Sequence, residues 1–288
     1  MTKWRRQETV AAILFLGPSL VGFSVFYLVP FAGGVVYSLL DSPVRGRFVG
    51  LANYAALLAS RAFLTALRNT ALFSALCLPL AVALSLVLAL LLVGRSRHVR
   101  TFRLVFITPL VVPIASVALV WQLGLGRWGA LNGMLVRLGM SPVDWMNTPW
   151  SRVALLALYL WKNLGYGMVL FLVGLQAIPG EYYEAAAMDG AGRWRRFRSI
   201  TCVYLTPTAF FVLIISIVNS FKVFREAYLM AGAYPDERIY MLQHYMNNTF
   251  RSLDYQRLTS AAVLMAAAVY LIVLCLFGVE RRIGQNIG

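Results

Sequence analysis

Six long stretches with almost no charged residue constrain the fold of this sequence more than any other feature. A helix needs about 20 apolar residues to cross the hydrocarbon layer of a membrane. Because backbone polar groups inside lipid must hydrogen bond to one another, we expect each stretch to be a helix; the alternating pattern of a membrane barrel does not occur. Only the fourth stretch contains a charge, Lys162. The stretches are Val10 to Leu40, Asn69 to Gly94, Leu104 to Gly126, Val153 to Gly180, Ser199 to Phe221 and Leu258 to Val279.

Composition supports the same interpretation. The chain is 60% hydrophobic and only 13% charged, whereas a soluble domain keeps about 25% of its residues charged. The net charge of +15 raises the question of nucleic acid, but the basic residues flank the apolar stretches, which is typical of topology control. We therefore expect an all-α, six-helix protein of the cell membrane that contacts lipid and binds no nucleic acid.

The expected organisation is a single transmembrane domain over 1–288. Within it, 10–68 would hold the first helix and an outer loop, and 69–280 a five-helix core. A basic N-terminus before an apolar stretch also fits a signal peptide, but the first uncharged stretch is longer than the apolar core of such a signal. We expect a retained first helix that ends near Pro30 to Gly34.

The distribution of lysine and arginine predicts the orientation. With the N-terminus inside, the inner segments hold 13 basic residues in 45 positions and the outer segments hold 10 in 85. Cytoplasmic loops carry the excess of basic residues, so both termini are expected in the cytoplasm. The inner segments are 1–9, 95–103, 181–198 and 280–288, and the outer segments are 41–68, 127–152 and 227–257.

Motifs of enzymes and metal sites are missing from the sequence. Cys77, Cys202 and Cys275 lie far apart in apolar stretches, and His98 and His244 lack ligand spacing and are expected to be solvated, so no metal site is predicted. None of the three lysines follows a glycine, as a phosphate-binding loop requires. With no nucleophile elbow or H-E-x-x-H pair either, we expect no enzyme activity and no cofactor in this chain.

One short charged segment lies between the fourth and fifth apolar stretches. Pro179-Gly180 is expected to end the fourth helix, Glu181 to Met188 is rich in helix formers, and Gly190 is suited to close a helix of about two turns. Four arginines follow within 193–198, with Trp194, Phe197 and Ile200 recurring every three residues, which predicts an amphipathic base. A connecting loop that merely obeys the positive-inside rule is the alternative.

The residues Glu184-Ala185-Ala186-Ala187-Met188-Asp189-Gly190-Ala191 resemble the EAA motif of ABC-importer permeases, here within a loop at 180–201. Phe197, Ile200, Thr201 and Pro207 follow at the expected spacing, and Gly174 to Pro179 is similar to the carbohydrate-uptake branch of that family. Weaker similarities to that branch occur, in order, at Gly50 to Tyr54, Arg68 to Thr70, Phe221 to Phe224 and Tyr228 to Met230. Two positions depart from the pattern: Val203 replaces a proline, and Ala233-Tyr234-Pro235 replaces Gly-Gly-Pro.

The resemblance implies the transmembrane domain of a type I ABC importer for a sugar or related polyol. In such a permease Glu184 would contact a cytoplasmic ATPase, Ala185 and Ala186 would allow close packing, and Gly190 would permit the turn out of the cleft. Asp189 would either cap the helix or pair locally. The resemblance also implies partners: a second permease, expected to be a different chain in a heterodimer, ATP-binding subunits that hold ATP and Mg, and an extracytoplasmic solute-binding protein.

Polar side chains inside the spans are candidates for the solute path. Such groups are costly in lipid and usually face a bundle interior, and a polyhydroxylated solute needs amide and charged groups beside aromatic rings. The lysines can instead snorkel to the headgroups, and the asparagines can join helices. The path candidates are Lys162, Asn163, Asn219, Lys222 and Gln122.

Two other classes of membrane protein remain as alternatives. An ion-gradient-driven secondary transporter of a small polar solute would carry carboxylates or charge pairs near the membrane midplane. The eleven acidic residues all fall in expected loops or at expected helix ends, which disfavours proton coupling. A passive membrane scaffold would have no polar path and no dependence on ATP.

Overall fold

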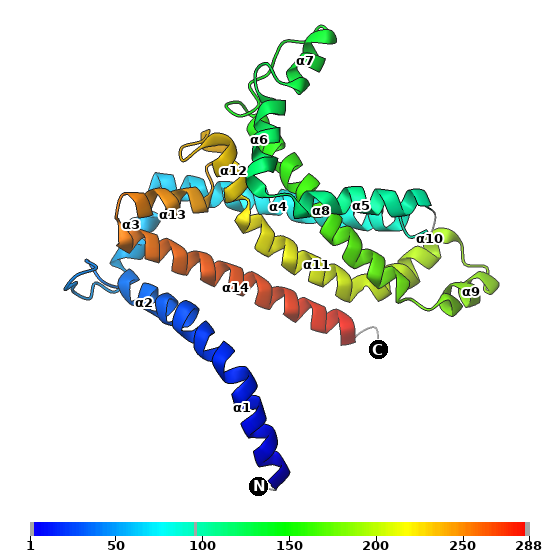
Figure 1. Ribbon diagram of the computed structural model, residues 1–288, viewed down its shortest axis with the longest axis horizontal. Coiled ribbons are helices and arrows are strands. Elements are labelled where there is room, and N and C mark those ends of the chain that lie inside the picture. Colours follow the sequence, from blue (N-terminus) through cyan, green and yellow to red (C-terminus); the bar gives the residue numbers. More distant parts are fainter. Residues whose placement is uncertain (1–2, 95–96, 286–288) are drawn as a thin grey trace. The chain divides into compact units, whose positions relative to one another are not determined.

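The computed structural model describes residues 3–94 and 97–285. Parts of three segments expected on the inner side, residues 1–2, 95–96 and 286–288, lie outside the described residues. Across the described ranges the chain is helical, with no β-strand beyond one isolated bridge between Leu40 and Phe48 (Figure 1). In this part of the chain six helices are long and apolar enough to cross a membrane, which confirms the predicted all-α class.

The chain separates into two compact units, each described here by itself. Unit 1 comprises Met1–Arg61 and Asn248–Ala268, and unit 2 comprises Ala62–Asn247 and Val269–Gly288. Two helices, α13 (Leu242–Arg251) and α14 (Tyr255–Gln285), pass from one unit into the other along the chain.

The first helix of unit 1 is longer than expected. It consists of α1 (Lys3–Phe23), a π-helical turn (Ser24–Leu28) and α2 (Val29–Ser38), so the predicted end near Pro30 to Gly34 is wrong. The π turn explains the difference, because its wider hydrogen bond, from Val29 N–H to Ser24 O, leaves room for the ring of Pro30, which would clash inside a regular α-turn.

The segment after α2 is tied back to the end of that helix. The side-chain amide of Asn53, in α3 (Ala52–Leu58), donates hydrogen bonds of 2.9 and 2.8 Å to the carbonyls of Ser38 and Leu40. The hydroxyls of Ser38 and Tyr54 also lie 2.6 Å apart. These bonds hold the first turns of the predicted outer loop.

Unit 2 contains the second to fifth predicted spans, and the sixth, α14, is shared between the two units. The second span is α4 (Arg61–Leu91), the fourth is α8 (Trp150–Gln176) and the fifth is α11 (Cys202–Lys222). The remaining elements of this part are α5 (Arg97–Val111), α6 (Ile114–Leu125), α7 (Ala130–Arg137), α9 (Gly180–Met188), α10 (Arg193–Arg196), a π turn (Phe197–Thr201), α12 (Phe224–Ala231) and the 3₁₀ turn η3 (Glu237–Ile239).

The predicted third helix is divided in two. Pro113 has an extended conformation, with φ −55° and ψ 136°, and it separates α5 from α6. The ring of a proline and its missing N–H prevent the helix from continuing. In Figure 1, α5 runs along α4 and α8, whereas α6 leaves them in another direction and leads to α7.

Helix α8 lies at the centre of unit 2 because glycines let its neighbours approach closely. A Cβ atom at Gly165 would collide with the backbone carbonyl of Phe106 in α5, and one at Gly167 would collide with the side chain of Ser85 in α4. A Cβ atom at Gly174 would likewise collide with the side chains of Leu205 and Thr208 in α11. Small residues therefore set the packing of this helix, as they do at many membrane helix interfaces.

Polar contacts fasten the segment that follows α12 to the ends of α4 and α8. The Asn69 amide donates to the carbonyls of Glu237 and Tyr240 at 2.6 and 3.1 Å, and its oxygen accepts a 3.1 Å hydrogen bond from the Arg152 guanidinium. The Thr70 hydroxyl accepts from the Leu242 N–H at 2.9 Å.

His244, in the first turn of α13, is fully buried, so the expectation that it is solvated is wrong. Its Nδ1 accepts a 3.2 Å hydrogen bond from the Met241 N–H, and its ring packs edge-on against Phe224 at 4.7 Å. Burial lowers the pKa of His244 to about 4, because the charged imidazolium loses its hydration. His98 is exposed, as expected.

We predict that Gly165→Ala lowers the free energy of unfolding by about 1–3 kcal/mol, because the added methyl group collides with the backbone of Phe106. Unfolding of the purified protein in detergent, followed by intrinsic fluorescence, measures this. Gly124→Ala is the matched control, since a Cβ at that helical glycine meets nothing within 4 Å. Equal effects of the two variants would contradict the close packing of α5 on α8.

We predict that acid destabilises the protein partly through His244. The pKa is about 4 in the folded protein against 6.5 ordinarily. The neutral imidazole therefore contributes its full share of the free energy of unfolding above pH 6.5, and this contribution is lost as the pH falls toward 4. The loss attributable to this group reaches about 3 kcal/mol. The free energy of unfolding, measured between pH 8 and 4, should fall less steeply with decreasing pH for His244→Gln than for the unaltered protein. Identical slopes would refute the assignment.

Candidate functional site

The predicted short helix between the fourth and fifth spans is confirmed as α9, Gly180–Met188. Pro179, with ψ 134°, ends the preceding turn, and Gly190 adopts φ +74° just after the helix. The Ala191 N–H bonds to Ala186 O at 2.9 Å and the Gly190 N–H to Ala187 O at 3.0 Å, which is the Schellman arrangement. A left-handed φ suits glycine best, so Gly190 explains why the helix ends here.

The outer face of α9 is exposed. None of its residues is buried; among the predicted coupling residues Glu184, Ala185, Asp189 and Gly190 are exposed, and Ala186 is half-buried. Met188, which the sequence analysis did not select, is 90% exposed. An exposed apolar side chain on a short rigid helix is suited to insertion into a partner's cleft.

The other face of α9 is attached to the beginning of the fifth span. The hydroxyls of Tyr183 and Thr201 lie 2.9 Å apart and share a hydrogen bond, and the rings of Tyr182 and Tyr204 lie 5.2 Å apart. Thr201 closes the π turn that leads directly into α11. A displacement of α9 is therefore expected to move the start of α11 with it.

The basic segment after α9 carries both arginines and aromatic rings. It comprises α10 and the following π turn, and its arginines include Arg193 and Arg196. The rings of Trp194 and Phe197 lie 5.6 Å apart, and Trp194 is largely exposed. Figure 1 shows α9 and α10 together beyond the ends of α8 and α11.

Lys162, the only charge in the fourth apolar stretch, forms an ion pair with Glu226. The Nζ of Lys162, in α8, lies 2.7 Å from Oε1 of Glu226, in the first turn of α12. Their side chains are only 14% and 7% exposed. From the sequence, Glu226 is expected at a helix end, and its burial is not predicted. Lys162 itself is the signal that could indicate a buried acidic partner, because a charge within a span requires one.

The asparagine candidates are divided between two helices. Asn163 is half-buried in α8, and its amide donates a 2.8 Å hydrogen bond to the carbonyl of Tyr159 in the previous turn. Asn219 is half-buried in α11, and Lys222 is exposed at the end of that helix. The Tyr159 hydroxyl donates to the Ser216 carbonyl at 2.9 Å and so joins the two helices at this level.

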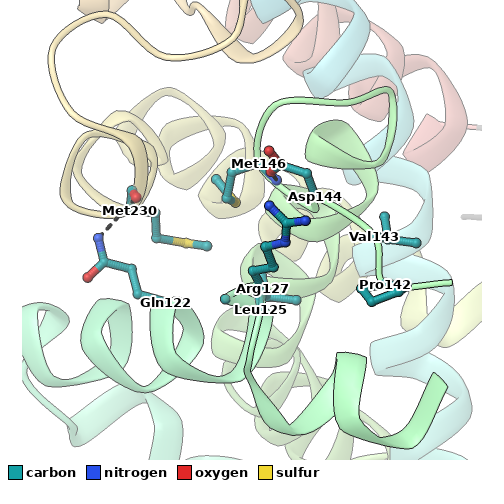
Figure 2. Close-up of a pocket in the computed structure, with 9 residues that line it drawn as sticks. Gln122, Leu125, Arg127, Pro142, Val143, Asp144, Met146 and Met230 are labelled. Atoms are coloured by element: carbon teal, nitrogen blue, oxygen red, sulfur yellow. Dashed lines mark hydrogen bonds between the residues drawn. The ribbon is translucent and has the colours of Figure 1, made fainter. Parts of the chain in front are cut away.

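Gln122 lies in a different place, at the contact between α6 and α12. Its amide donates to the carbonyls of Leu229 and Met230 at 2.9 and 3.0 Å. It also lines a cavity of about 510 Å³, in which the Arg127 guanidinium points toward Asp144 (Figure 2). Helix α12 thus contacts two of the candidates. Its Glu226 pairs with Lys162, and its backbone carbonyls accept the hydrogen bonds from Gln122.

Asp144 is ionised at this cavity at neutral pH. A hydrogen bond from the Asn147 side chain, aided by the backbone N–H groups of Met146 and Asn147 and by Arg127, lowers the pKa of Asp144. The cavity therefore presents one negative and one positive group.

The described ranges contain no group of three or more His, Cys, Asp or Glu side chains that could hold a metal ion. The three cysteines are free thiols, and only Cys77 is buried.

Comparison with known proteins identifies the family. Residues 81–288 match the family described as binding-protein-dependent transport system inner membrane component. The chain is 35% identical over 231 residues, 77% of its length and 72% of the relative's, to the arabinooligosaccharides transport system permease protein AraP of Bacillus subtilis (strain 168). It is 32% identical over 281 residues, 94% and 95% of the two chains, to the trehalose/maltose transport system permease protein MalF of Thermococcus litoralis.

A solved structure shares the fold. A chain of a bacterial ABC transporter involved in the import of the acidic polysaccharide alginate superposes with a TM-score of 0.83 at 24% identity, covering 96% of each chain. The helical architecture and the sequence matches agree: this chain is a multi-pass membrane protein and belongs to the family of binding-protein-dependent transport system inner membrane components.

Proposed function

We propose that this chain is the permease subunit of an ATP-driven importer for a sugar or related polyol, and that α9 couples it to a cytoplasmic ATPase. The observation that carries the proposal is the geometry of α9: one face is exposed, and the other is bonded to the start of α11 through Tyr183 and Thr201. The names of the relatives, which include arabinooligosaccharides and trehalose/maltose, support a carbohydrate.

The coupling residues act through shape and charge. Ala185 and Ala186 are small enough to let a partner's backbone approach closely, Glu184 offers an exposed negative charge, and Gly190 turns the chain back toward α10. Asp189, the last residue before the turn, stands beside Gly190 on the same exposed tip. ATP binding in the partner would favour one arrangement of this helix over another and so shift the permease between two states.

The remaining partners follow from the same function. Both termini would lie in the cytoplasm, with α9 on that side. A second, different permease would complete the translocation path, two ATPase subunits would bind ATP and Mg, and an extracytoplasmic binding protein would deliver the solute. In support, a second solved structure of the alginate transporter is described as a complex with a pentasaccharide-bound periplasmic protein.

The solute path is proposed along the polar side chains of α8 and α11. Lys162 and Asn163 are neighbours in α8, and Asn219 and Lys222 lie near the end of α11. Aromatic rings are available for stacking, since Trp161 directly precedes Lys162 in α8 and its ring lies 6.0 Å from that of Trp121. Gln122 would belong to the entrance rather than the centre, because it borders the cavity with Arg127 and Asp144.

The buried Lys162–Glu226 pair is also what an ion-gradient-driven transporter would contain. The two functions differ in their energy source: uptake into vesicles that depends on ATP, and is unaffected by dissipating the ion gradients, favours the importer.

We predict that Glu184→Arg reduces ATP-dependent uptake by the reconstituted complex about tenfold or more and weakens ATPase binding, because a reversed charge would face the partner. Glu280→Arg, a charge reversal in α14 at the same predicted end of the membrane, is the control and should transport normally. Undiminished uptake and ATPase binding in the Glu184 variant would exclude α9 as the coupling element.

We predict that Asn219→Leu lowers uptake about 3- to 10-fold, the loss expected for one hydrogen bond to the solute, while ATPase binding stays intact. Val218→Leu, an exposed neighbour on the same helix, should leave uptake unchanged. Normal uptake by the Asn219 variant would remove this residue from the path but would leave the coupling proposal standing.

A further inference from the structure

The charge of the transported solute is not settled by the relatives, since their names and descriptions include both an acidic polysaccharide and sugars such as trehalose and maltose. The proposed path itself carries charged groups that bear on the question. Lys162 is the one charge within the fourth apolar stretch, and an unpaired cation there would attract an anionic solute strongly, because fields are poorly screened away from water.

The structure shows that this cation is neutralised. Glu226 lies 2.7 Å from Lys162, and both side chains are mostly buried. The other ion pairs of the described residues, Asp236–Arg238 and Asp254–Arg257, have exposed arginines. A close pair has no net charge, so its field on a third group is that of a dipole and falls off faster with distance than the field of a free lysine.

The pair keeps unused hydrogen-bonding capacity. Oε2 of Glu226 is buried and has no hydrogen-bond partner among the described residues, and an ammonium group with three donors uses one on Glu226. One free acceptor beside free donors suits hydroxyl groups, which both donate and accept.

We infer that Glu226 is a specificity-determining residue: by neutralising Lys162 it adapts the path to an uncharged, polyhydroxylated solute and against an anionic one. The inference rests on the proposed function, in which Lys162 and Asn163 lie on the path. Lys222 and Arg225 are also positive, but both are exposed, and exposed charges are screened more strongly than a buried one.

Equilibrium binding to the detergent-purified complex, without the solute-binding protein, tests the inference on the permease alone. The probes are uncharged trisaccharides of glucose, mannose and arabinose, and trisaccharides of galacturonate and mannuronate of the same ring number. The unaltered complex should bind the tightest uncharged probe at least about tenfold more strongly than the tightest uronate.

Variants then separate the effect of charge from that of side-chain loss. Glu226→Gln exposes the charge of Lys162 and should shift the ratio toward uronates by about tenfold. The double variant Lys162→Met with Glu226→Gln, which has no charge, should retain the preference for uncharged sugars, as should the exchanged pair Lys162→Glu with Glu226→Lys. Arg251→Met, which removes an exposed positive charge at the end of α13 outside the proposed path, should leave the ratio unchanged.

Equal or tighter binding of uronates by the unaltered complex would overturn the inference even if Glu226→Gln does not fold, and so would an unchanged ratio in a folded Glu226→Gln variant. Both results would leave the importer function intact. If no sugar binds although the complex transports with ATP, the proposed path is wrong and the inference falls with it. If ATP drives no uptake at all, the failure lies in the proposed function.

Discussion

The close approach of backbones along α8 is the contact on which the rest of unit 2 depends. Gly165, Gly167 and Gly174 lie on this helix and face α5, α4 and α11 respectively, at separations that admit no side chain. Lipid supplies no hydrophobic driving force between helices, so van der Waals contact over such flat surfaces must hold the bundle together. The buried polar contacts are placed around this framework: Ser85 donates to the Leu164 carbonyl, and Tyr159 reaches α11.

The same helix joins the two parts of the proposed mechanism. Lys162 and Gln176 are fourteen residues apart in one unbroken helix, which corresponds to about 21 Å, and α9 begins four residues after Gln176. Because the hydroxyls of Tyr183 and Thr201 are hydrogen bonded, movement of α9 is expected to displace the start of α11, which packs against α8 at Gly174. Coupling over this distance therefore needs only helices that move as bodies.

The sequence predicted the elements well where a single physical rule decides them. Long uncharged stretches give membrane helices, and the Pro179, Gly190 and alanine pattern gave α9 within one residue. Prediction failed where two segments had to be considered together. Whether Pro30 ends a helix depends on the π turn just before it, Ser24–Leu28, and the burial of His244 depends on Phe224 packing against it. Likewise the lysine in the fourth span was evident, but nothing in the sequence selected Glu226 from eleven acidic residues as its partner.

A buried ion pair is a poor source of stability, because desolvating two charges costs about as much as their attraction returns. Its effect is instead on which elements move together. Removing one partner of such a buried pair costs about 3–5 kcal/mol, and separating Lys162 from Glu226 would leave two uncompensated buried charges. Gln122 holds the far end of α12 by two further hydrogen bonds. Helix α12 is only eight residues long, too short to be stable alone. It is therefore expected to follow α8 and α6 in any rearrangement, so that the pair stays closed, and the path stays neutral, in each state through which the solute passes.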